Sequence, residues 1–169
     1  DTRLEGPRLK THAAFLTPQI ALSECLFGAI VRDTRELKLS DDERINYFPA
    51  SPLVTVTWVI EGDTQIDQHG NNVERAKNAA PLPSMTVAGP RSSPFVSWNP
   101  GPVFAISVGF YPDAWMDLTG VEPESLADKT LSEIPPQVLD LLEPLPAMTA
   151  TEIGRASRRE SVEISVGDG

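Results

Sequence analysis

Apolar and polar residues alternate most regularly in two segments, 53–60 and 103–110. In the first, the sequence LVTVTWVI places valines, Trp58 and isoleucine at every second position. In the second, VFAISVGF alternates large apolar residues with small ones. A period of two in β-branched and aromatic residues is typical of a strand. We therefore expect two strands here, and Pro49 and Pro52 prevent the first from extending backward.

Shorter apolar runs between turn residues predict the rest of a β-unit. The expected strands are 28–32, 64–68, 84–88 and 95–98. A hairpin turn at 61–63 would join the strand at 53–60 to the one at 64–68. Turn signals recur about every ten residues, which favours a sandwich or barrel of short strands. Before this unit, residues 1–18 predict a polar extended arm, and residues 20–26 predict a short helix.

The pattern changes to helical spacing after Tyr111. Pro112 and Asp113 suit the first turn of a helix, and Gly120 suits its C-terminal cap. A helical turn is also expected at 122–128, followed by a helix from Pro136. An apolar stripe at helical spacing runs along this last segment: Val138, Leu141, Leu142 and Leu145. Strands followed by helices predict an α+β fold, with the helices gathered at one end of the β-unit.

Charge and length narrow the function classes. The chain has 169 residues, which suits about one ordinary domain. Its 24 acidic and 14 basic residues give a net charge of −10. A domain that holds duplex DNA offsets the phosphate charge with a basic face, so this balance argues against DNA as a direct partner. No apolar run approaches the ~20 residues of a membrane span, so we expect no contact with a membrane.

Residues for metal or covalent catalysis are sparse. The two histidines, His12 and His69, lie far apart, and neither has a partner at ligand spacing. Cys25 is the single cysteine and sits in an apolar run, where a thiol usually packs as a small hydrophobe. The chain has neither a nucleophile elbow nor a phosphate-binding loop. We therefore predict no metal site, no cofactor and no catalytic residue.

The aromatic residues of the strands are the remaining candidates for a site. Core packing is one interpretation of them. The other is a small ligand held inside the β-unit, because binding pockets combine aromatic walls with a few polar groups. The candidate ligand-binding residues are Trp58, Phe104, Phe110 and Thr57. Both interpretations remain open at the level of the sequence.

Several motifs in a fixed order resemble the N-terminal regulatory domain of AraC-type bacterial transcription regulators. They are 25–35 (CLFGAIVRDTR), 46–52 (NYFPASP), 57–62 (TWVIEG), 87–90 (VAGP), 110–115 (FYPDAW) and 118–120 (LTG). The resemblance spans about residues 20–145, and it implies a cupin-like β-barrel of short antiparallel strands followed by a C-terminal helical region. It also implies a domain that senses an unknown small-molecule effector and forms a homodimer, while a separate helix-turn-helix domain binds DNA.

The expected organisation follows from this resemblance. Residues 1–18 form the arm, 19–110 the barrel, 111–160 the helical dimerisation region, and 161–169 a tail whose alternating residues predict a short strand. Because the chain starts at Asp1 and ends soon after the helices, we expect it to be the sensor half of a longer cytoplasmic protein. The Val138–Leu145 stripe is the candidate dimer interface. The alternatives are a stand-alone cupin-type enzyme and a purely structural dimerisation module.

Overall fold

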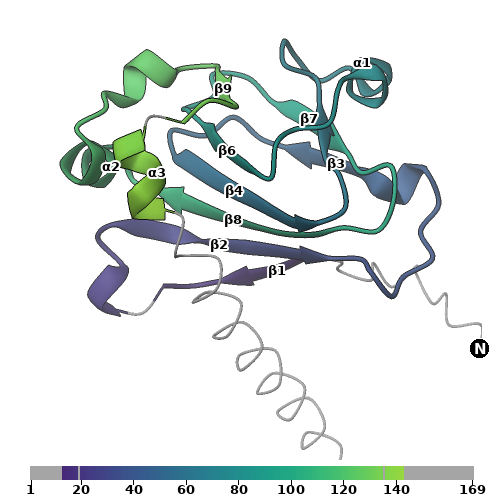
Figure 1. The fold of residues 1–169 in the computed structure, drawn as a ribbon, viewed down its shortest axis with the longest axis horizontal. Helices are drawn as coiled ribbons and strands as arrows, with labels where there is room; N and C mark the ends of the chain where they lie inside the picture. The colour runs from purple at the N-terminus through teal and green to yellow at the C-terminus, as the bar shows by residue number, and fades with distance from the viewer. Residues whose placement is uncertain (1–12, 19, 135, 143–169) are drawn as a thin grey trace, which may run out of the picture. The chain divides into compact units, whose positions relative to one another are not determined.

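Two antiparallel β-sheets form the framework of the protein (Figure 1). The computed structural model describes residues 13–18, 20–134 and 136–142, and the chain divides into two compact units, 1–133 and 134–169. The strands of the larger sheet are β1 (Ala13–Leu16), β2 (Leu26–Asp33), β4 (Val54–Glu61), β6 (Met85–Ala88), β8 (Phe104–Phe110) and β9 (Thr130–Leu131). Their spatial order is β1-β2-β8-β4-β6-β9.

The two strands predicted most firmly lie side by side in the middle of the larger sheet. β4 pairs with β8 so that Val56 faces Val108 and Trp58 faces Ile106. Residues opposite each other on paired strands point to the same side of a sheet. These four side chains are buried, so this face of the sheet forms the core of the first unit. The prediction of strands at 53–60 and 103–110 is therefore confirmed to within a residue.

The smaller sheet joins three short strands in the order β3-β7-β5. They are β3 (Ile45–Phe48), β5 (Gln65–Ile66) and β7 (Phe95–Trp98). The predicted hairpin between 53–60 and 64–68 is wrong, because β5 is only two residues long and pairs with β7 instead of β4. Buried Asn99 connects the two sheets: its Oδ1 accepts hydrogen bonds from Arg32 on β2 (3.2 Å) and from Asn46 on β3 (2.9 Å).

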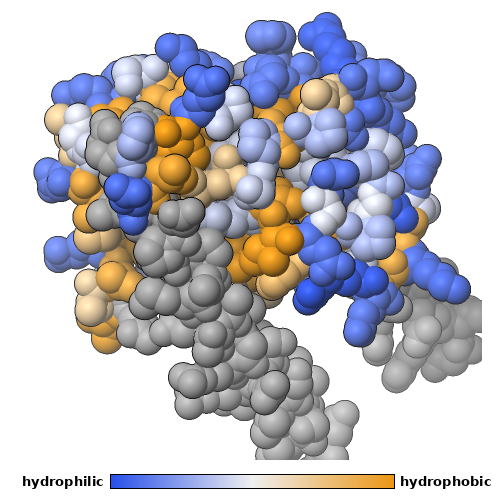
Figure 2. Space-filling model, viewed as in Figure 1, coloured by the Kyte–Doolittle hydropathy of each residue, from blue (hydrophilic) through white to orange (hydrophobic). Residues whose placement is uncertain are grey.

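One helix was not predicted. Helix α1 (Val73–Asn78) follows β5, and the Oδ1 atom of Asn72 caps it by accepting a hydrogen bond from the Arg75 amide at 3.0 Å. An asparagine at this position satisfies one of the free N–H groups of the first turn. Hydrophilic side chains cover the surface around α1 in Figure 2.

The N-terminal segments differ from the expectation in two respects. Residues 13–16 of the predicted arm form β1, an edge strand paired with β2. The helix expected at 20–26 is a single 3₁₀ turn, η1 (Ile20–Leu22), because β2 already begins at Leu26. A second 3₁₀ turn, η2 (Asp42–Arg44), precedes β3.

The predicted helices after Tyr111 are present. Helix α2 (Pro112–Thr119) starts with its proline and ends at Gly120, whose φ of 71° gives the left-handed cap. The helical turn predicted at 122–128 is present as a 3₁₀ helix, η3 (Pro123–Leu126). Helix α3 (Pro136–Leu142) belongs to the second unit, whereas α2 and η3 belong to the first, with the strands. The predicted 161–169 strand lies outside the described residues.

The α+β class is confirmed, and the described strands pair in an antiparallel manner. The expected closed barrel is not seen among the described residues, because the strands divide into two separate sheets, each with two ends. Figure 2 shows apolar side chains gathered over β2 and β8. Within the described part of the chain, no helix is long and apolar enough to cross a membrane.

Candidate functional site

The four predicted ligand residues do not share one environment. Trp58 and Phe110 lie on the buried face of the larger sheet, each 5% exposed, and Phe110 packs edge-on against Trp115 at 5.6 Å. Thr57 precedes Trp58 on β4 and therefore points to the opposite face, where its hydroxyl lies 2.8 Å from that of Ser107. Thr57 and Trp58 consequently cannot line the same pocket. The Nε1 atom of Trp58 is buried without a hydrogen-bond partner in the described structure.

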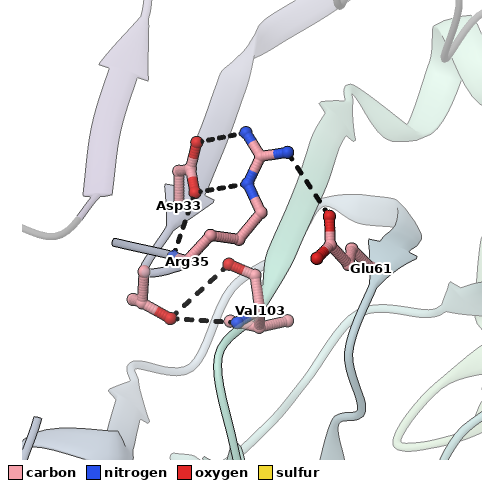
Figure 3. Close-up of polar contacts among 5 residues, drawn as sticks. Asp33, Arg35, Glu61 and Val103 are labelled. Atoms are coloured by element: carbon pink, nitrogen blue, oxygen red, sulfur yellow. Dashed lines mark hydrogen bonds and ion pairs between the residues drawn. The ribbon is translucent and has the colours of Figure 1, made fainter. Parts of the chain in front are cut away.

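Phe104, the fourth predicted residue, begins β8 and lies beneath the guanidinium of Arg35. Figure 3 shows how this arginine is held between Asp33 and Glu61. The guanidinium of Arg35 sits 4.3 Å from the centre of the Phe104 ring. Asp33 accepts hydrogen bonds from Arg35 Nε at 2.9 Å and Nη2 at 2.6 Å, and Glu61 accepts one from Nη1 at 3.4 Å. The side-chain hydrogen bond from Arg35 lowers the pKa of Asp33, and the same contact raises the pKa of Arg35. The charge of Arg35 is thus paired with two carboxylates, and its guanidinium covers the Phe104 ring.

A half-open cavity of about 270 Å³ lies elsewhere, where the smaller sheet meets the loop before β9. Three separate segments of the chain build its wall. Its lining residues are Gln68, His69, Gly70, Arg91, Ser92, Ser93, Pro94, Phe95 and Asp128. None of the four predicted ligand residues belongs to this lining. Most of the lining side chains are polar, which suits a small hydrogen-bonding ligand rather than a hydrocarbon.

Arg91 is the central charged group of the cavity wall. It is only 9% exposed, and its guanidinium stacks on the Phe95 ring at 4.8 Å. The Phe95 ring also stacks with that of Phe48, with 4.8 Å between the ring centres and an angle of 15°. Arg91 Nη2 donates a hydrogen bond to the Thr130 hydroxyl, whereas Nε is buried without a partner. Burial lowers the pKa of Arg91, because the charged form loses hydration.

Asp128 places a negative charge on the same wall. Its backbone has a φ of 56°, a left-handed conformation that aspartate tolerates better than most residues. Its carboxylate accepts hydrogen bonds from the Ser92 amide and the Ser92 hydroxyl, both at 2.8 Å. These two bonds, with the nearby charge of Arg91, lower the pKa of Asp128. No carboxylate lies within 4.0 Å of the Arg91 guanidinium in the described structure, so Arg91 and Asp128 are neighbours without forming an ion pair.

A close backbone approach holds Asp128 in place. A Cβ atom at Gly89 would lie 2.0 Å from the Leu126 carbonyl oxygen, so only glycine fits there. The Asp128 amide donates to the Pro90 carbonyl at 2.8 Å, and the Gly89 amide donates to the Lys129 carbonyl at 3.0 Å. The loop that carries Arg91 and the segment that carries Asp128 therefore form one rigid wall.

Asp67 supports the third segment of the wall. It is 3% exposed, and its carboxylate accepts the amides of His69 (3.1 Å) and Asn72 (3.0 Å). The hydrogen bond from the Asn72 amide is the main cause of the lowered pKa of Asp67. The ionised carboxylate thus fixes the turn that presents His69 and Gly70 to the cavity.

The candidate dimer residues fall only partly within the described structure. Val138 lies on α3 and is 2% exposed within one chain, which covers this member of the predicted stripe. Leu141 and Leu142 fall at the end of α3, and Leu145 lies outside the described residues. Among the described residues, no group of three or more His, Cys, Asp or Glu side chains is placed to hold a metal ion. His69 lines the cavity, and His12 lies outside the described residues.

Comparison with protein-family models, with curated proteins and with solved structures finds no match to this chain.

Proposed function

We propose that this chain is the ligand-sensing and dimerisation domain of an AraC-type transcription regulator, with DNA contacted by a separate helix-turn-helix domain. The motifs listed above suggest the family, and two antiparallel sheets followed by helices are compatible with a cupin-like unit. The net charge of −10 favours a domain that acts on DNA only through another domain.

The observation that carries the sensing role is the cavity around Arg91. Arg91 brings a largely buried charge to the cavity lining, and no carboxylate pairs with it in the described structure. A perturbed charge in a cavity is a candidate for ligand contact. Asp128 lines the cavity together with Arg91, and Thr130 accepts a hydrogen bond from Arg91. Both residues lie only a few positions before residue 134 in the sequence, where the second unit starts. A ligand held by Arg91 would therefore touch the end of the first unit directly before the predicted dimer helix.

A reporter assay tests both parts of the proposal. Residues 1–169 are fused to a DNA-binding domain that represses its operator only as a dimer, and repression is measured with a library of small polar metabolites. We expect repression that changes in the presence of a ligand. Repression that no compound alters would favour a purely structural dimerisation module, and no repression would contradict the dimerisation role.

The dimer interface has its own variant. Replacing Leu141 and Leu142 with glutamate places charges on the predicted apolar stripe, and we expect a soluble monomer in analytical ultracentrifugation at tens of micromolar. Leu22→Glu is the matched control, because Leu22 lies on η1, outside the proposed dimerisation region, and is 47% exposed. A wild-type chain that sediments as a monomer would contradict the proposed homodimer.

A further inference from the structure

The cavity wall carries two opposite charges that do not neutralise each other. Arg91 lines the cavity and stacks on Phe95, and its Nη2 donates to Thr130. Its Nε is enclosed by the protein, whereas Nη1 makes no hydrogen bond in the described structure and is the donor left for a ligand. Asp128 is exposed and ionised, and its carboxylate is oriented by Ser92. The Arg91 guanidinium and the Asp128 carboxylate are more than 4.0 Å apart, although each affects the pKa of the other. The cavity wall therefore carries a positive and a negative group, its two poles, at separate places.

A ligand that fits this wall needs both an anionic and a cationic group a short distance apart. A simple carboxylate would pair with Arg91 but would also face the Asp128 carboxylate, and like charges at this range repel. A simple amine would face the buried guanidinium. A zwitterion satisfies both poles, because its carboxylate accepts hydrogen bonds from Arg91 while its ammonium donates to Asp128.

The size of the cavity limits the ligand further. Its volume of about 270 Å³ is below the range of about 300–1,000 Å³ that holds drug-sized ligands. The remaining wall supplies side-chain donors and acceptors from Gln68, His69 and Ser93. A small ligand with polar groups beside its charges therefore fits better than a large or hydrocarbon-rich one.

We propose that the cavity binds a free α-amino acid, with its carboxylate on Arg91 and its ammonium on Asp128. This inference rests on the proposed sensing function and names the class of its effector. Both charges of the ligand are required, so an amino acid amide and an N-acetyl amino acid, which each lack one charge, are matched non-ligands.

The test uses the 169-residue chain and the common L-amino acids as probes. Each is added at about 10 mM, enough to raise the melting temperature of a site with a Kd of about 1 mM or tighter. For any amino acid that stabilises the protein, titration calorimetry gives its Kd and those of its amide and N-acetyl derivatives. We expect each derivative to bind roughly tenfold to a hundredfold more weakly, since each loses a charged hydrogen-bond partner.

Three variants connect binding to the two poles. Arg91→Gln and Asp128→Asn should each weaken binding by a similar factor, and asparagine tolerates the left-handed backbone at 128. Arg35→Gln is the control, because Arg35 also stacks on a phenylalanine but is paired with Asp33 and Glu61 away from the cavity lining. It should bind the amino acid as the wild type does. If Arg91→Gln does not fold, the Kd values for Asp128→Asn and for the amide and N-acetyl derivatives still test whether both charges of the ligand are bound.

Two results would overturn the inference. One is the absence of stabilisation by any amino acid; the other is equal binding of the amide or the N-acetyl derivative. Neither result would remove the sensing function, because the reporter assay detects a response to a metabolite of any class. Conversely, amino acid binding without dimerisation in the reporter assay would support the site and contradict the dimerisation role.

Discussion

Arg35 and Arg91 both stack on a phenylalanine ring, at 4.3 and 4.8 Å, but their surroundings are opposite. Arg35 is exposed and hydrogen-bonded to two carboxylates, Asp33 and Glu61. Arg91 is 9% exposed, has a single side-chain hydroxyl as its partner and forms no ion pair in the described structure. Arg35 completes a surface cluster of paired charges, whereas Arg91 lines a cavity and has no paired carboxylate in the described structure.

The two arginines therefore differ in how far their charge is compensated. A guanidinium in water loses little when it pairs with carboxylates, and such pairs contribute modestly to stability. A buried guanidinium with an unpaired donor is costly in the folded chain alone, because its lost hydration is not replaced. Stacking on a phenylalanine therefore does not distinguish the two arginines, whereas the pairing of their charges does.

Removing the phenylalanine ring beneath an arginine should lower the unfolding free energy more than the other changes considered. The loss should be larger for Phe95, beneath Arg91, than for Phe104, beneath Arg35. Phe95→Ala loses contacts with both Arg91 and Phe48, and we expect unfolding free energy to fall by roughly 3 kcal/mol. Phe104→Ala loses one stacking partner, Arg35, and should cost about 1 kcal/mol less. Urea denaturation followed by circular dichroism measures both. An equal or larger loss for Phe104→Ala would contradict the comparison.

Much of the fold was predictable because its main strands are locally encoded. β4 and β8 bury every second residue, and that period is visible in the sequence. β5 was misassigned because two residues carry no period, and its pairing with β7 joins Gln65 to Trp98, far along the chain. Tertiary contacts, not local propensity, decide such short strands.

The candidate site was harder to predict, for a different reason. Its wall comes from three segments around residues 68–70, 91–95 and 128, which no sequence motif links. In the sequence Arg91 follows Gly89 and Pro90 and resembles an ordinary exposed turn residue. Its side chain contacts Phe95 and Thr130, and the contact with Thr130, 39 residues further along the chain, is visible only in the folded structure. Trp58, by contrast, drew attention as an aromatic residue and lies in the core face.

The hydrogen bond between Arg91 and Thr130 should have the second largest effect. Thr130→Val keeps the shape of the side chain but removes the hydroxyl that accepts from Nη2. Hydrogen bonds to charged groups contribute about 1.5–3 kcal/mol, so we expect a loss near 2 kcal/mol. Thr55→Val is the control: Thr55 is half-buried on β4 with no side-chain hydrogen bond in the described structure, and its substitution should change stability by less than about 0.5 kcal/mol. Equal effects of the two substitutions would show that Thr130 does not support Arg91.

Arg35→Gln should have a smaller effect, and salt should reduce it. The ion pairs of Arg35 are exposed, with side-chain exposures of 39% for Arg35 and 63% for Glu61. Ions at about 1 M shorten the screening length to about 3 Å, so the stability difference between wild type and variant should shrink as salt is added. The cost of Thr130→Val should change less with salt, because that contact is part-buried and its acceptor is a neutral hydroxyl rather than an exposed carboxylate. Parallel urea titrations at low and high salt make the measurement, and a salt-independent Arg35→Gln effect would contradict the assignment.

The smallest expected effects are shifts in the pKa values of two aspartates, and they distinguish the causes at the two arginines. Arg35 is the main cause of the lowered pKa of Asp33, so Arg35→Gln should raise that pKa toward the ordinary value of about 4. The Ser92 amide is the main cause of the lowered pKa of Asp128, and it remains in Ser92→Ala. Ser92→Ala removes the second cause, the hydroxyl's hydrogen bond, and should raise the pKa of Asp128 more than Arg91→Gln, which removes the smallest cause. A carboxylate with a lowered folded pKa adds stability that is present above its unfolded pKa and is lost as the pH falls through the folded value. Stability of the wild type should therefore fall below about pH 4, and Arg35→Gln should remove part of that dependence. Carbon NMR titration of the side-chain carboxyl groups reads each pKa directly. A large shift of Asp128 in Arg91→Gln would mean that the two charges of the cavity already form a tight pair, which would remove the separated poles on which the amino acid site depends.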